Sequence, residues 1–323
     1  MNQEMYRGRG KKAKNIKSAI QKKMGEWWAT IEDKAVRKLA EDNTVVTGGC
    51  IASMLLGEKV NDFDVYFRTY KSAKAIAGYY VKKFQPQNRK GIACAISVVG
   101  SEDRIRIVIK SAGVASDEGA EKPYEYFESR PEGDAGEYVG EVMQDHGNIE
   151  NAYEETEDKA LQVEDDGKPK HRPVFLSTNA ITLSGKVQLV LRFFGEPDEI
   201  HANYDYVHCT NYWSSWDKNL VLRQAALESL LSKELYYVGS KYPVCSIFRL
   251  RKFIRRGWNI NAGQMLKVMM QVSALDLTNI KVLQDQLTGV DCTYFLEVIG
   301  KLKEKDPDKV NAAYLIKIID RMF

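Results

Sequence analysis

The sequence has few cysteines, few histidines and no long apolar run, and each scarcity excludes a class of protein. Its five cysteines are scattered without paired spacing, which argues against a disulfide framework and favours a reducing compartment, the cytoplasm. Four isolated histidines without neighbouring cysteine pairs argue against a zinc site. No stretch approaches the roughly 20 apolar residues that a membrane span needs, and no apolar segment follows the charged N-terminus as in a secretory signal. We therefore expect a cytoplasmic protein without a membrane partner.

The rest of the composition is that of an ordinary globular chain. Of the 323 residues, 44% are hydrophobic, 28% charged and 10% aromatic, which excludes a collagen-like or wholly disordered chain. This length predicts about two domains and suffices to bury a core without disulfides.

Charge is distributed unevenly along the chain. Residues 1–24 carry eight Lys and Arg against one acidic residue, whereas residues 117–166 carry eighteen Asp and Glu against three basic residues. The net charge of +3 therefore hides a strongly positive remainder, which attracts phosphate polyanions. We interpret residues 1–24 as a basic tail, either merely solvated or a nucleic-acid-binding arm, and residues 112–172 as an acidic, flexible insertion.

The order of elements predicts an α+β fold, in which a mixed sheet with flanking helices (residues 25–215) precedes an all-helical domain (residues 216–323). Strand-like alternation and helical spacing set these boundaries. Helices are expected at 15–41, 50–56, 70–84, 243–256, 262–274, 278–288, 292–303 and 308–322, and strands at 43–47, 62–67, 92–99, 104–110, 173–177, 186–194 and 203–209.

The most informative segment is TGGCIASMLLGEKVNDFDVYFR, residues 47–68. A glycine pair between a strand and a helix lets backbone N–H groups approach a phosphate, and the helix N-terminus adds partial positive charge. Asp62 and Asp64 alternate on the next strand, so their carboxylates point to one face. Two such carboxylates repel each other unless a cation lies between them, and Mg²⁺ prefers carboxylates together with substrate phosphates. Gly48, Gly49 and the two aspartates therefore predict phosphoryl chemistry.

A site with two metal ions usually needs a third carboxylate from a neighbouring strand. The candidate is Asp205, because an acid inside the aromatic run 203–209 is hard to explain structurally. The alternative is Asp103, which follows a turn-like sequence where an acid is ordinary.

Gly-Gly followed twelve residues later by Asp-x-Asp resembles the polymerase-β-like nucleotidyltransferases, with the closest spacing in the head domain of CCA-adding enzymes and bacterial poly(A) polymerases. The residues that carry the resemblance are Gly48, Gly49, Leu55, Leu56, Gly57, Asp62 and Asp64. Ala52 and Ser53 depart from it, because these families have Arg-Asp there. Residues 195–205 also resemble uncharacterised phage-encoded nucleotidyltransferase-like proteins, which would place the chain in the host cytoplasm.

The resemblance implies a role for each candidate residue. Asp62, Asp64 and Asp205 would be catalytic and would bind Mg²⁺ or Mn²⁺. Gly48 and Gly49 would hold the triphosphate of an NTP such as ATP, with Ser53 as a further nucleotide-binding candidate in the same helix. His201 and His208 are expected to be structural hydrogen-bonding residues.

A second candidate region is the basic helix predicted around SIFRLRKFIRRGW, residues 246–258. Arg249, Lys252 and Arg256 share one stripe at helical spacing. They would hold nucleotide phosphates or an RNA backbone, or else form a solvated face paired with acidic residues. Thr178 and Asn179, just before a strand, are candidates for contacting a base or ribose.

These observations together predict a metal-dependent nucleotidyltransferase. It would transfer NMP from an NTP to a hydroxyl acceptor, RNA with a tRNA-like 3′ end, and release pyrophosphate. One alternative is a phage nucleic-acid-binding or structural protein with a vestigial site. Another is a toxin-like enzyme that nucleotidylates a protein.

Overall fold

The computed structural model describes residues 10–84, 94–101, 104–111, 124–126, 169–176 and 179–277, together with 279, 282 and 286. The chain forms two compact units, and each is described by itself. The first comprises Met1–Arg130, Leu161–Ala202 and His208–Leu230, and the second Pro131–Ala160, Asn203–Val207 and Leu231–Phe323. The predicted helices 292–303 and 308–322 lie outside the described residues, as do most of the predicted helix 278–288 and most of the acidic insertion.

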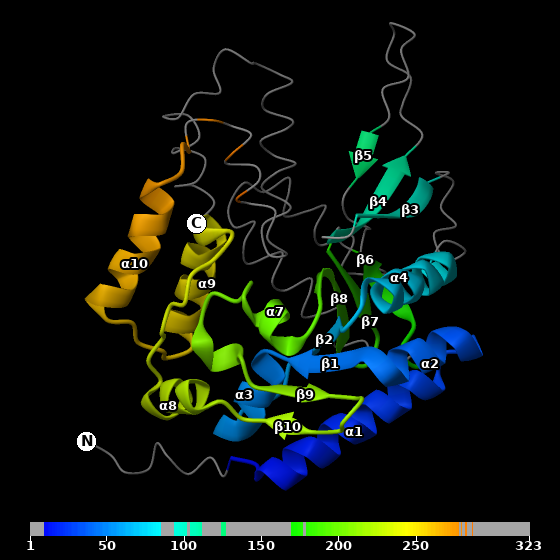
Figure 1. Ribbon diagram of the computed structural model, residues 1–323, viewed down its shortest axis with the longest axis horizontal. Coiled ribbons are helices and arrows are strands. Elements are labelled where there is room, and N and C mark those ends of the chain that lie inside the picture. Colours follow the sequence, from blue (N-terminus) through cyan, green and yellow to red (C-terminus); the bar gives the residue numbers. More distant parts are fainter. Residues whose placement is uncertain are drawn as a thin grey trace, which may run out of the picture. The chain divides into compact units, whose positions relative to one another are not determined.

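The first unit is built on a seven-stranded mixed sheet of order β10-β9-β1-β2-β8-β7-β6 (Figure 1). The central strand β2 pairs antiparallel with β1 and parallel with β8, so the predicted mixed sheet is confirmed. Its strands are β1 (Thr44–Thr47), β2 (Phe63–Phe67), β6 (Pro173–Leu176), β7 (Ala180–Leu183), β8 (Val187–Phe194), β9 (Tyr212–Ser214) and β10 (Leu220–Val221). A second sheet contains β3 (Cys94–Ser101), β4 (Arg104–Ser111) and β5 (Tyr124–Tyr126).

The helices of the chain are α1 (Ala13–Ala29), α2 (Lys34–Asn43), α3 (Gly49–Leu56), α4 (Tyr70–Phe84), α7 (Pro197–His201), α8 (Gln224–Ser232), α9 (Pro243–Arg255) and α10 (Ala262–Ser273), with a 3₁₀ turn at Val207–Cys209. The single helix predicted over 15–41 is wrong. The chain breaks between α1 and α2 because Asp33 caps α2, accepting hydrogen bonds from the backbone N–H groups of Ala35 and Val36 at 2.8 and 3.1 Å.

Helix α1 also changes the account of the basic N-terminus. The helix predicted from residue 15 overlapped the proposed tail 1–24, and residues 13–24 form most of α1, so the assignment of these residues to a tail is wrong. The physical reason is its apolar stripe: Ile16, Ile20 and Met24 are fully buried in the main core. The basic side chains of this segment are therefore displayed on a fixed helix.

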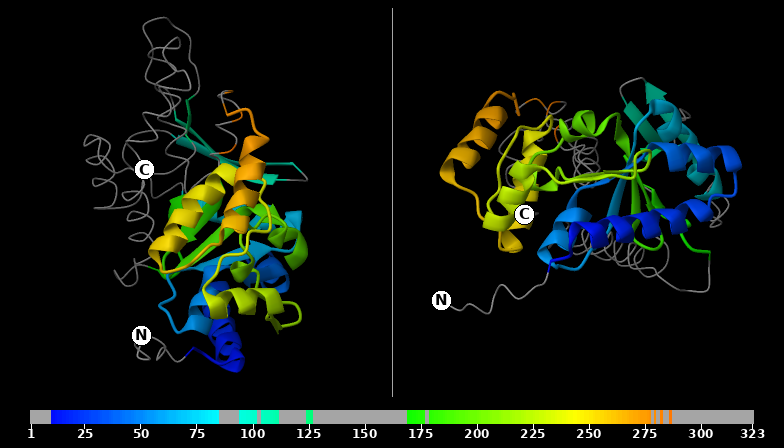
Figure 2. Two further views of the ribbon diagram at one scale, coloured as in Figure 1. Left: turned by 90° about the vertical axis from the view of Figure 1, so that its left-hand side faces the viewer. Right: turned by 60° about the horizontal axis from the view of Figure 1, so that its bottom comes forward.

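The two faces of the sheet have different coverings. Helices α1, α3 and α4 share one core with the strand side chains Val46, Val65, Leu189 and Ile181. Paired residues of neighbouring strands point to the same face, so these side chains define the core face. Figures 1 and 2 show α1 and α7 on opposite sides of β1. The short helix α7 thus covers the face that carries Asp64.

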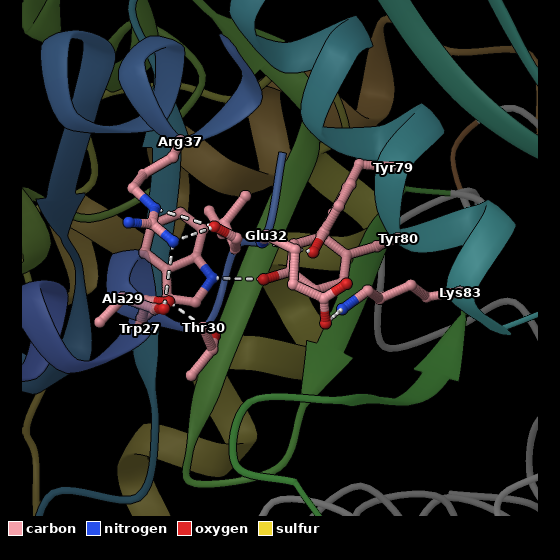
Figure 3. A network of polar contacts seen from close by, with 9 residues as sticks. Trp27, Ala29, Thr30, Glu32, Arg37, Tyr79, Tyr80 and Lys83 are labelled. Carbon is pink, nitrogen blue, oxygen red and sulfur yellow. Dashed lines mark hydrogen bonds and ion pairs between the residues drawn. The ribbon is translucent and has the colours of Figure 1, made fainter. Parts of the chain in front are cut away.

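A polar network ties the turn between α1 and α2 to α4 (Figure 3). The indole N–H of Trp27 donates to the Tyr80 hydroxyl at 2.7 Å, and Lys83 forms an ion pair with Glu32 at 2.9 Å. The guanidinium of Arg37 donates to the carbonyl oxygens of Ile31 and Ala29. These bonds fix the helices behind the sheet, so the strands carrying the candidate site rest on a rigid support.

The second unit is helical around α9 and α10, with the segment 203–207 packed into it. The strand predicted at 203–209 is wrong, because this segment makes one isolated bridge, between Tyr206 and Tyr237, and then enters the 3₁₀ turn. The Tyr206 ring contacts those of Tyr237 and Phe253, each with centroids 5.7 Å apart, and its hydroxyl donates to the Ser246 carbonyl. Tyr206, one of the aromatic residues that suggested a strand, is instead buried against aromatic rings of this unit.

Candidate active site

The glycine turn joins the end of β1 to the start of α3. Gly48 has φ 84° and ψ −150°, a conformation that residues with a side chain rarely adopt. Its N–H donates to the carbonyl oxygen of Cys209 at 3.1 Å, which holds the turn to the chain entering β9. Helix α3 then runs to Leu56 and ends at Gly57, which is left-handed as the sequence predicts for a C-cap. The predicted strand, glycine turn and short helix are confirmed.

The carboxylate of Asp64 lies directly against this turn. A Cβ built on Gly48 would lie 2.6 Å from Asp64 Oδ2, so the absence of a side chain at Gly48 is what lets the carboxylate approach the backbone. Nothing lies within 4 Å of a Cβ built on Gly49. The first residue of α3 therefore borders open space beside an acidic group.

Asp62 lies two residues before Asp64, immediately ahead of β2, and both side chains are half-buried. Both aspartates affect the pKa of the neighbouring Cys50 thiol. Burial raises this pKa well above its ordinary value, and the negative charges of Asp64 and Asp62 raise it further. Both carboxylates thus act on the first turn of α3, whose N-terminal dipole favours negative charge. The structure brings together Gly48, Gly49, Asp62 and Asp64, as the motif predicts.

A row of polar residues crosses the sheet through Asp64. Thr47 on β1 pairs with Asp64, Asp64 with Gln188 on β8, and Gln188 with Thr182 on β7. These side chains share one face. Gln188 was missed in the sequence, although a glutamine within the apolar run VQLVLRFF was a visible signal. It is 7% exposed and stands on the strand beside the acidic pair.

Below the glycine turn, Thr47 is fixed by a buried hydrogen-bond network. Its hydroxyl oxygen lies 2.8 Å from His201 Nε2 and 2.8 Å from the Asn211 carbonyl oxygen. Burial, followed by the charge of Arg223, lowers the pKa of His201 to about 4, so this ring is neutral at pH 7. His201 thus makes a buried hydrogen bond within the fold, as expected, and its purely structural role stays a prediction. His208, also buried, has its pKa lowered to about 3 by burial.

Ion pairs and a cap hold α7, which supplies His201, in place. Glu196 and Glu199 form a capping box at its start. Arg68, which follows β2, pairs with Glu196 at 2.5 Å, and Arg223 pairs with Asp198. These contacts anchor the N-terminal part of α7, ahead of His201, the residue that supports the turn.

The remaining candidates of the first unit lie away from the turn. Ser53 is half-buried one turn further along α3, and its carbonyl accepts the N–H of Glu58. Asn179 is buried, and its carbonyl accepts the N–H of Leu191. It stands three residues from Thr182, or about 10 Å along the strand direction from the polar row. Thr178 and Asp103 lie outside the described residues.

Asp205, Arg249 and Arg256 belong to the second unit. The Asp205 side chain is 3% exposed, and its carboxylate is paired with the guanidinium of Arg249. The backbone carbonyl of Asp205 also accepts the N–H of Val238. Arg256 is exposed at the C-terminal end of α9. Within the described part of the chain, Asp205 and Arg249, predicted separately as metal and phosphate ligands, therefore contact each other.

The donor set at the glycine turn suits one hard cation. Among the described residues, no group of three or more His, Cys, Asp and Glu side chains gathers as a metal site. Asp62 and Asp64 supply two carboxylates, and Mg²⁺ commonly binds one or two carboxylates while substrate phosphates and water complete its shell. The pair therefore fits a magnesium ion carried with a nucleotide.

Comparison with known proteins gives a family and a distant structural likeness. A structure of the Thermotoga maritima CCA-adding enzyme complexed with tRNA has a TM-score of 0.36 and 11% identity, covering 88% of this chain and 56% of that one. The chain thus spans about half the length of that enzyme, and the likeness carries no argument about function. No curated protein matches. None of the helices in the described residues is long and apolar enough to cross a membrane. Residues 18–233, which include the glycine turn, the acidic pair and the whole seven-stranded sheet, match the Gabija anti-defense 2 family, and the chain belongs to that family.

Proposed function

We propose that this protein is a metal-dependent nucleotidyltransferase that transfers NMP from an NTP to a hydroxyl acceptor and releases pyrophosphate. The carrying observation is the Asp64 carboxylate packed against Gly48 at the N-terminus of α3. This packing places a carboxylate that can bind a cation next to backbone N–H groups that can bind a phosphate. The family name supplies the context, because it describes action against a defence called Gabija.

Each residue of the turn has a defined part in this reaction. The N–H groups of Gly49 and of the first turn of α3 bind and orient the triphosphate, while Gly48, whose own N–H is bonded to the Cys209 carbonyl, shapes the turn. Asp62 and Asp64 would hold Mg²⁺ or Mn²⁺, which when bound neutralises phosphate charge. The acceptor oxygen attacks the α-phosphorus while the bond to the β-phosphate oxygen breaks, so catalysis is mainly positioning and charge stabilisation. Asp205 as a third ligand stays a prediction.

The proposed acceptor is an RNA 3′ end, because the chain outside the acidic stretch is strongly basic. A protein acceptor is the second candidate, and the family name favours it, since a component of the opposed defence would be the natural target. The two acceptors give different products, so one experiment separates them.

The test incubates purified protein with each α-³²P-labelled NTP in turn, total RNA or a lysate carrying the Gabija defence, and Mg²⁺ or Mn²⁺. We expect label from one NTP in an RNA or a protein band. Asp64→Asn keeps the size of the side chain but removes its charge, and should lower transfer by at least about a hundredfold.

The matched control is Asp42→Asn, because Asp42 is an exposed carboxylate on α2 that pairs with Lys38. It should transfer at the wild-type rate. Wild-type protein that labels nothing under any condition contradicts the proposed function, and full transfer by Asp64→Asn contradicts the site.

A further inference from the structure

A cluster of basic side chains surrounds the turn between β7 and β8, outside the glycine turn. The three lysines are Lys23 on α1, Lys170 before β6, and Lys186 in the turn itself. His171 lies among them, buried and 4% exposed. Lys23 belongs to the basic segment 1–24, whereas Lys170, His171 and Lys186 were not singled out from the sequence.

Geometry places Lys23 over the turn. A Cβ built on Gly185 would lie 3.5 Å from Lys23 Nζ and 3.3 Å from the ring of His171. Lys23 Nζ also lies 5.9 Å from the ring centroid of Phe63. The ammonium group is thus held between α1 and the start of β2.

The shifted pKa of His171 reflects the lysine charges near it. The pKa of His171 is lowered to about 4, first by burial and then by the charge of Lys23, with Lys170 acting in the same direction and Glu26 opposing them. His171 is therefore neutral at pH 7, and the positive charge of the cluster comes from its lysines.

The cluster lies at the same edge of the sheet as the acidic pair. The N–H of Phe63, the residue between Asp62 and Asp64, donates to the carbonyl of Lys186 at 2.9 Å. Strand β1 ends at this edge, at Thr47, which pairs with Asp64. The phosphates of a nucleic acid that approaches Asp62 and Asp64 would be repelled by these carboxylates, and the positive lysine side chains offset that repulsion.

Helix α1 continues the positive surface from Lys23 towards its N-terminal end. Its lysines Lys14, Lys17 and Lys22 are exposed or half-buried, with Lys11 and Lys12 just before the helix. Its one acidic residue, Glu26, lies 4.0 Å from Lys22 in an exposed pair. Lysines spread along a helix suit the repeated charges of a phosphodiester backbone better than a single phosphate.

We infer that α1 and the turn 184–186 form a binding surface for the backbone of a single-stranded nucleic acid, with Lys23, Lys170 and Lys186 binding the phosphates closest to the glycine turn. Calling this strand the acceptor rests on the proposed function, whereas the binding surface does not. RNA and DNA share the phosphodiester chemistry.

The test measures fluorescence anisotropy of a short labelled RNA, and of a DNA of the same sequence, against protein in EDTA over a series of KCl concentrations. The triple variant Lys23→Gln, Lys170→Gln, Lys186→Gln should bind at least about tenfold more weakly. The slope of log affinity against log salt should fall by about 2, as for the loss of three single-strand phosphate contacts.

The control Lys34→Gln, Lys38→Gln, Lys82→Gln removes the same charge from exposed positions on α2 and α4 and should bind as wild type does. Thermal melts verify that both variants fold. Absence of binding by the wild type, or equal weakening by both variants, overturns the inference. Lysine-dependent binding without label transfer leaves the surface intact and defeats only the proposed function. Label transfer to a protein, without any binding of nucleic acid, supports the proposed function and overturns the inferred binding surface.

Discussion

At the scale of single residues, the two glycines of the turn have separable roles. Gly48→Ala forces a side chain into φ 84° and towards Asp64 Oδ2, whereas Gly49 is helical with open space around it. We expect Gly48→Ala to lower the free energy of unfolding by about 2–3 kcal/mol. Gly49→Ala should leave it unchanged or raise it by up to about 1 kcal/mol, because alanine favours a helix. Urea unfolding of both variants measures this difference.

Equal destabilisation by the two alanines would contradict the packing of Asp64 on Gly48. A further comparison is the double variant Gly48→Ala, Asp64→Ala. Removal of the carboxylate relieves the collision but not the backbone strain, so this variant should regain only part of the loss.

At the scale of elements, α9 is joined to the segment 203–207 by the pair between Asp205 and Arg249 and by the bond from Tyr206 to Ser246. Asp205→Ala leaves the guanidinium without its carboxylate, and Arg249→Ala leaves a buried carboxylate uncompensated. Each should cost about 2–3 kcal/mol of unfolding free energy, less than for a fully buried pair because Arg249 is 31% exposed. The double variant should cost less than the sum, as urea unfolding would show.

The same variants decide the role of Asp205. If Asp205→Ala keeps the wild-type unfolding free energy yet weakens Mn²⁺ binding, measured by electron paramagnetic resonance, the ion pair is incidental and the carboxylate is a metal ligand. Lys38→Ala, which breaks an exposed pair with Asp42, serves as the control and should change stability by less than about 1 kcal/mol.

At the scale of the whole molecule, the three histidines among the described residues, all buried, make folding sensitive to mild acid. In the folded state the pKa is lowered to about 4 for His171 and His201 and to about 3 for His208. The unfolded chain binds these protons from an ordinary pKa near 6.5. It therefore holds more protons than the native state below that pH, and the unfolding free energy falls as the pH drops from about 6.5 towards 4. Urea unfolding at pH 7.5, 6.5, 5.5 and 5.0 measures the loss.

This range lies above the ordinary pKa of carboxylates, so the slope there reports mainly on histidine. His201→Gln should reduce the slope by about one third, because glutamine takes up no proton and the other two histidines remain. Urea midpoints at pH 7.5 correct for the lost bond to Thr47. A profile that stays flat between pH 6.5 and 5.0 would contradict the burial of these rings.

Local patterns in the sequence were sufficient to predict much of the secondary structure of the first unit. The Gly-Gly turn, the left-handed Gly57 and the alternating Asp62–Phe67 were readable because each depends on nearby residues. The hairpin of β9 and β10 was not, since β9 is held by pairing with the distant strand β1 and the two-residue strand β10 only by pairing with β9. The partner of Asp205 could not be read either. The ion pair joins residues far apart in the chain. The sequence around an aspartate in an aromatic run does not distinguish a metal ligand from the partner of a guanidinium group.

The parallel pairing of β2 with β8 has a consequence for how the protein is made. Residues 68–186 lie between these two strands, and a ribosome adds about 5–20 residues each second. Strand β2 therefore emerges several seconds before its neighbour. During that interval Asp62 and Asp64 can stand beside the glycine turn but lack the strand that completes the sheet next to them. The nascent chain thus contains its motif before the strand beside it, and the bond from Gly48 to Cys209 and strands β9 and β10 follow later still.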